Sequence, residues 1–190
     1  MDDPLAEDDL DQVRSYFEVA SRPYLSRPWS WLAWALILPT AALATRGVLS
    51  DGGPVGLIIL WTLAVIAGGV IEAGQFLSSR GVRSSSTLST WVFRAQGNLS
   101  VVALVISIAL LWQGLGWILP GLWLLLLGHS LYTLGGMAFA PLRTSGLLYQ
   151  LGGLFALWPH QLEMRIFAVT TFVANLWVAW SIWRGKSGTG

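Results

Sequence analysis

The chain has 190 residues, of which 54% are hydrophobic and only 11% are charged, and its mean hydropathy is +0.61. Soluble domains are about 25% charged. This composition argues strongly against an ordinary soluble domain, a disordered chain and a nucleic-acid-binding protein, and it predicts an integral membrane protein. The absence of cysteine excludes disulfides, iron–sulfur clusters and thiol nucleophiles.

The first 28 residues form an acidic head, with seven acidic residues against three arginines. Apolar residues in this head recur at the 3-4-3-4 spacing of one helix face. They are Leu10, Val13, Phe17, Ala20 and Tyr24. The pattern predicts an amphipathic cytoplasmic helix, which either lies along the ends of the membrane helices or docks a protein partner with a basic surface. An acidic N-terminus is unlike a signal peptide, so we expect the chain to be mature as it stands.

Six apolar segments follow the head, each near the ~20 residues that a helix needs to cross ~30 Å of hydrocarbon. They are residues 29–45, 54–76, 98–117, 120–139, 141–158 and 166–183. We therefore expect an all-α, six-helix membrane domain over residues 29–184 and a short flexible tail at 185–190. The fifth segment is short and interrupted by glycines, so a re-entrant or broken segment is the alternative there.

The basic residues predict the orientation of these spans. With the N-terminus inside, nine of the eleven lysines and arginines lie on the cytoplasmic side, as the positive-inside rule requires. An even number of spans then places both termini in the cytoplasm. Many of the 12 tryptophans lie near span ends, where indoles prefer the headgroup level. The sequence thus predicts a Trp-rich, multi-pass protein of the cell membrane (the inner membrane of a bacterium).

Glycines predict which helices touch most closely. Gly121, Gly128 and Gly135 recur every seven residues along the fourth span, and Gly146 and Gly153 do so along the fifth. Because membrane helices associate over small residues, we expect these two spans to pack tightly as an antiparallel hairpin.

Glu72 and His129 are the ionisable residues that lie clearly within spans, and we expect both to face the bundle interior. Counting residues from the span ends brings further polar groups to the same cytoplasmic depth, where Glu72 can pair with Arg94. The candidate polar site comprises Glu72, Gln75, Arg94, Asn98, His129, Tyr132, Tyr149, Gln150 and Asn175. It is either a set of interhelical hydrogen bonds or a cavity for a small polar or amphiphilic molecule.

We expect no metal and no cofactor, with ligation of a haem or chlorophyll by His129 alone as the exception. The sequence carries no motif of an intramembrane protease or hydrolase. The leading hypothesis is therefore a non-enzymatic accessory, regulatory or scaffold subunit of a membrane assembly. Its partners would be the lipid bilayer and a protein at the acidic head, and no nucleic acid. The alternatives are a small-molecule transporter or substrate-binding membrane subunit, and an enzyme that uses Glu72 and His129.

Overall fold

The computed structural model describes residues 28–77, 87–137, 140–158 and 161–187, and this part of the chain is helical apart from short connections at 113–115, 157–158 and 161–162. The all-α prediction is confirmed. The elements are α2 (Pro28–Leu77), α3 (Thr87–Trp112), the short 3₁₀ helix η2 (Gly116–Ile118), α4 (Leu119–Met137), α5 (Ala140–Ala156) and α6 (Glu163–Ser187). The predicted head helix lies outside the described residues. Helix α6 continues to Ser187, which is beyond the expected start of the tail.

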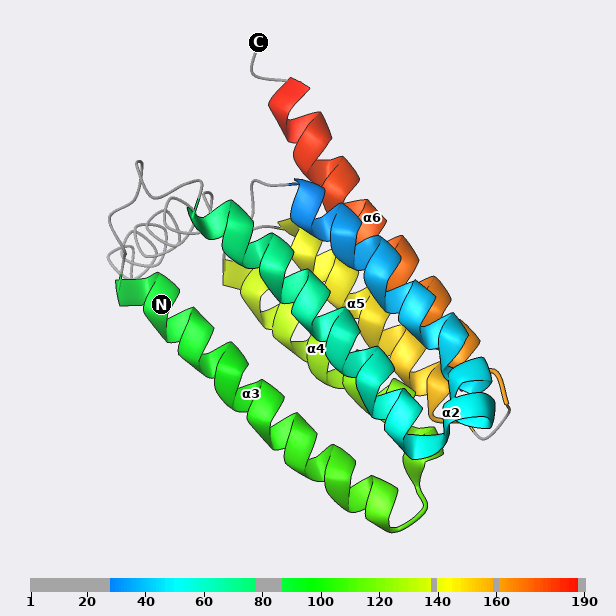
Figure 1. The fold of residues 1–190 in the computed structure, drawn as a ribbon. Helices are drawn as coiled ribbons and strands as arrows, with labels where there is room; N and C mark the ends of the chain where they lie inside the picture. The colour runs from blue at the N-terminus through cyan, green and yellow to red at the C-terminus, as the bar shows by residue number, and fades with distance from the viewer. Residues whose placement is uncertain (1–27, 78–86, 138–139, 159–160, 188–190) are drawn as a thin grey trace, which may run out of the picture.

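Helix α2 is a hairpin of two helical arms (Figure 1). Its elbow is Gly53, with φ 59° and ψ −158°, a backbone conformation that is essentially confined to glycine. Pro54 follows and begins the second arm, where a missing N–H is tolerated. The first arm (28–52) and the second arm (54–77) run antiparallel, and Ser30 of the first donates a hydrogen bond to Glu72 of the second.

The helices lie roughly parallel or antiparallel to one another, and α3 stands at the edge of the bundle (Figure 1). Helix α4 packs chiefly against α5, and α6 packs against both α2 and α5. The packing of α3 is mainly against α4 and η2. The elbow of α2 and the α5–α6 connection lie at one end, where Arg46 binds the carbonyl of Gln161 and pairs with Glu163 at 3.4 Å.

Three of the described helical stretches are long and apolar enough to cross a membrane. They are Pro28–Gly74, Gly116–Gly135 and Glu163–Gly185. This finding indicates a membrane protein, but helix length and apolarity do not support the predicted six-span bundle. The first two predicted spans are the two arms of α2, which form one continuous stretch because Gly53 alone separates them. The apolar part of α3 (Gly97–Trp112) is short, and α5 has 17 residues.

The predicted packing of the glycine-rich helices α4 and α5 is confirmed. A Cβ on Gly128 would lie 2.8 Å from the backbone nitrogen of Gln150 and 2.8 Å from the carbonyl oxygen of Gly146. A Cβ on Gly153 would lie 3.0 Å from the carbonyl oxygen of Gly121. The glycines of α5 therefore form a helix contact, and α5 is continuous across them.

Candidate functional site

Tyr149 and Asn175 are the two candidate residues that the structure joins directly. Both side chains are buried, and the Asn175 amide donates to the Tyr149 hydroxyl at 2.9 Å and to the Thr171 carbonyl at 2.8 Å. Nearby, Ser145 donates to the carbonyl of Ala174 at 3.3 Å. These bonds connect α5 to α6, so this part of the predicted polar layer is an interhelical contact.

Glu72 is exposed on the second arm of α2, so the expectation that it faces the bundle interior is wrong, and its carboxylate binds the first arm. Its Oε1 atom accepts hydrogen bonds from the Ser30 hydroxyl at 2.5 Å and from the Trp34 indole at 3.1 Å. Both donors lie on the first arm. The predicted ion pair with Arg94 is not present among the described residues, because Arg94 lies on α3 and the Glu72 carboxylate faces the first arm.

Tyr132 contacts a residue that the sequence analysis did not include in the candidate site. The Arg143 guanidinium donates to the Tyr132 hydroxyl at 2.9 Å and lies 5.0 Å from the centre of its ring. This pair connects the end of α4 to the start of α5, on the exposed surface.

The other candidate residues do not join these pairs. Arg94, Asn98 and His129 are exposed, and Gln150 is half-buried on α5 beside Gly128. Gln75 lies on α2, and its side chain is outside the part of the chain that the structure describes. The expectation that His129 faces the interior is wrong. Gly128 faces α5, and the next residue is rotated about 100° around the helix.

The described polar side chains thus form separate contacts and not one connected layer. In the described ranges, no buried side-chain nitrogen or oxygen lacks a hydrogen-bond partner. Buried polar groups in a membrane are stabilised when neighbouring helices satisfy them. The arrangement accounts for Glu72, Tyr132, Tyr149 and Asn175 by helix packing alone.

Two indole–hydroxyl bridges were missed by the sequence analysis. Trp61 donates to the Thr45 hydroxyl at 3.2 Å, and Trp123 donates to the Ser107 hydroxyl at 3.0 Å. Each hydroxyl in turn donates to the carbonyl four residues before it. For Trp61, which lies well inside the second predicted span, the available signal was an indole N–H that usually needs an acceptor away from the headgroup level. Trp123 lies three residues from the start of the fourth predicted span, so its position gave no such signal.

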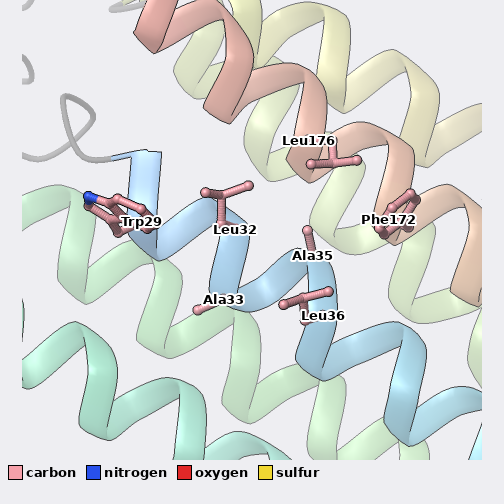
Figure 2. A pocket seen from close by; sticks show the side chains of 7 residues that line it. All are labelled: Trp29, Leu32, Ala33, Ala35, Leu36, Phe172 and Leu176. Carbon is pink, nitrogen blue, oxygen red and sulfur yellow. The ribbon is translucent and has the colours of Figure 1, made fainter.

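A groove of about 360 Å³ runs along the outer surface between the first arm of α2 and α6 (Figure 2). Its walls are apolar and aromatic, and none of the nine candidate polar residues lines it. The lining residues are Trp29, Leu32, Ala33, Ala35, Leu36, Phe172 and Leu176.

No family model, curated protein or solved structure matches this chain.

The described parts of the chain contain no candidate metal site, because no three or more His, Cys, Asp or Glu side chains form a group there. His129 is exposed on α4, and its carbonyl accepts a hydrogen bond from Thr133 at 2.9 Å. Ligation of a haem or chlorophyll by this histidine stays a prediction, which the absorption spectrum of the purified protein would test.

Proposed function

We propose that this chain is a non-enzymatic multi-pass membrane protein that acts as an accessory, regulatory or scaffold subunit of a membrane assembly. The observation that carries the proposal is the outer face of the second arm of α2. Gly69 and Ala73 are exposed there, four residues apart, and Ala64 and Gly68 are the buried positions of this arm. No neighbouring atom lies within 4 Å of the place where a Gly69 Cβ would be. This small-xxx-small pattern is the one over which membrane helices associate.

Helix α3 also has a largely exposed apolar surface. Among its described side chains, which are residues 94 and 97–112, those of Ala103 and Ser107 are the buried ones, and they lie where α3 contacts α4. Val101, Val105 and Ile108 are each more than half exposed. The second arm of α2 and the helix that follows it therefore both offer apolar surface for a partner helix.

The contacts of the polar residues favour a scaffold over the alternative, a transporter with a polar site in the inner half of the bundle. A substrate site needs polar groups that converge on a shared space. Tyr149 and Asn175 bind each other, and Glu72 binds the first arm of α2. These groups are used in helix packing.

For the membrane arrangement, we infer six crossings of the cell membrane with both termini in the cytoplasm. The α2 hairpin supplies two antiparallel arms, of which the first ends near Arg46 and the second returns to Ser30. The distribution of basic residues supports this orientation. The acidic head, which precedes the described residues, provides a second contact for a protein partner on the cytoplasmic side.

The test is photocrosslinking in the native membrane. Benzoylphenylalanine replaces Ile66, which is 54% exposed on the second arm, or Leu154, which is 58% exposed on α5. We expect one discrete protein adduct from position 66 and only lipid adducts from position 154. In the full-length chain, Gly69→Ile should abolish the adduct from position 66, because the larger side chain prevents close helix approach.

Two further variants complete the design. Gly47→Ile is the matched control, since this glycine is also exposed with no neighbour within 4 Å, and the adduct should persist. Glu72→Gln should also keep it, because a glutamine carbonyl still accepts from Ser30 and Trp34. Lipid adducts alone at position 66, or a transport activity lost in Glu72→Gln, would contradict the scaffold proposal.

A further inference from the structure

The groove between α2 and α6 has a distinct arrangement at one end. There Trp29 of α2 meets Trp183 of α6 edge to face, with ring centres 6.1 Å apart. The remaining α6 wall is made by Phe172 and Leu176, which lie on the same helix face as Trp183 at helical spacing. The groove is therefore lined by apolar and aromatic side chains (Figure 2), and one of them, Trp29, contacts Trp183.

Arg184 follows Trp183 directly on α6, which puts a cationic group at the level of this end of the groove. The Arg184 guanidinium is stacked over the Trp180 ring, 3.8 Å from the ring centre, and its side chain is exposed. Stacking uses the face of a guanidinium and leaves its in-plane N–H donors available, and these donors match the geometry of a phosphate. No carboxylate in the described ranges pairs with Arg184.

The distance along α6 from the groove to Arg184 is close to the thickness of one leaflet. Phe172, which lines the groove, and Arg184 are twelve residues apart on α6, which is ~18 Å at 1.5 Å per residue. Half of a ~30 Å hydrocarbon core is ~15 Å. A molecule with a phosphate at Arg184 and an acyl chain along the groove would thus place both parts at their natural depth, with the two tryptophans at the headgroup level.

We propose that this groove is a binding site for one anionic phospholipid, whose phosphate is bound by Arg184 and whose acyl chain lies between the first arm of α2 and α6. The site lies on a different surface from the outer face of the second arm of α2, so it does not depend on the partner contact. Apolar complementarity holds the chain in the groove, and the charge of Arg184 selects anionic headgroups over zwitterionic ones.

The test is native mass spectrometry of the full-length protein in detergent, with phosphatidylglycerol and phosphatidylcholine of identical acyl chains added in equal amounts. We expect one phosphatidylglycerol to be retained in preference to phosphatidylcholine. Arg184→Gln should lower that preference about fivefold, as expected for loss of one exposed charge pair. Arg165→Gln removes an exposed arginine from the opposite end of α6 and should leave the preference unchanged.

A second pair of variants tests the groove itself. Ala33→Phe fills it and should remove the retained lipid, whereas Ala67→Phe adds the same side chain at an exposed position on the second arm and should not. Size-exclusion profiles and thermal unfolding verify that each variant folds. Equal retention of the two lipids by the unmodified chain, or equal behaviour of Arg184→Gln and Arg165→Gln, would overturn the proposal. Lipid retention by Ala33→Phe would overturn it as well.

Discussion

At the residue scale, several polar side chains in the described parts of the chain stabilise contacts between neighbouring helices. Tyr149 and Asn175 do so at the centre of the bundle, where the Tyr149 ring belongs to the same apolar cluster as Leu124 and Phe167. Trp34, Trp61 and Trp123 do so between adjacent antiparallel helices. Such bonds are worth about 0.6 kcal/mol each on average in a membrane protein. Their contribution is mainly to helix register, since a donor and an acceptor must lie at one level.

Tyr149→Phe is the simplest test of this role. It removes the hydroxyl that accepts from Asn175 and keeps the ring that fills the core. We expect the free energy of unfolding to fall by about 0.6–1.7 kcal/mol, measured by denaturant titration in detergent micelles. Tyr132→Phe is the matched control, because its hydroxyl contacts the exposed Arg143, and its effect should be close to zero. If the free energy of unfolding fell as much in Tyr132→Phe as in Tyr149→Phe, the buried Tyr149–Asn175 bond would not stabilise the protein more than an exposed bond does.

The candidate site was only partly predictable from the sequence. Counting residues along a span gives the depth of a polar group, and this places Tyr149 and Asn175 near one level. It does not give the direction around the helix, which depends on packing. Gly128 determines that direction for α4 and leaves its neighbour His129 on the surface. Glu72 faces the first arm for a similar reason, since Gly68, one turn before it, lies against the Trp34 ring.

At the element scale, the α4–α5 contact makes a clear prediction. Gly128→Ala places a methyl group 2.8 Å from two backbone atoms of α5, and backbone cannot move aside as a flexible side chain can. We expect a loss of about 1–3 kcal/mol in the free energy of unfolding. Gly74→Ala, at an exposed helical position with no neighbour within 4 Å, should gain about 0.8–1.0 kcal/mol from helix propensity. Equal effects of the two substitutions would contradict close approach of α4 and α5.

Two helical hairpins of this chain share one design. Thr45 and Trp61 bridge the arms of α2, and Ser107 and Trp123 bridge α3 to α4, in both cases across 16 residues. Each connection also contains a glycine at positive φ, Gly53 in the first hairpin and Gly114 in the second. The same spacing and bond recur 62 residues apart. This correspondence relates the first two predicted spans to the next two, and it is a direct repeat of a hairpin and not an inverted one.

The elements differ in how far the sequence could predict them. The antiparallel packing of α4 and α5 follows from glycines at heptad spacing, because that pattern directly describes the contact surface. The continuity of α2 through its elbow was not predictable in this way. Gly52, Gly53 and Pro54 indicate a loop between two helices. The backbone shows instead that the break is confined to Gly53, so the two arms are joined without a loop.

At the scale of the whole molecule, the connections that the structure describes gather at one end of the bundle. In the described parts of the chain, the elbow of α2, the α3–α4 turn and the α5–α6 connection lie at one end (Figure 1). The start of α2 and the end of α6 lie at the other. This arrangement fits six crossings, even though the apolar part of α3 (Gly97–Trp112) and the whole of α5 are short for a span. A short apolar helix can be accommodated by local thinning of the bilayer, at a modest cost in free energy.

The proposed crossings can be tested directly because the chain has no cysteine, so a single introduced cysteine reports one position. We expect Asp51→Cys, in the elbow region of α2, and Gln113→Cys, in the α3–α4 turn, to react in intact cells with a membrane-impermeant maleimide. Ser187→Cys, at the end of α6, should react only after the membrane is opened. Protection of Asp51→Cys together with labelling of Gln113→Cys would mean that α2 enters the bilayer without crossing it twice. Reaction of Ser187→Cys in intact cells would place the C-terminus outside, and the positive-inside assignment would then be wrong, since it puts Arg184 and Lys186 on the cytoplasmic side.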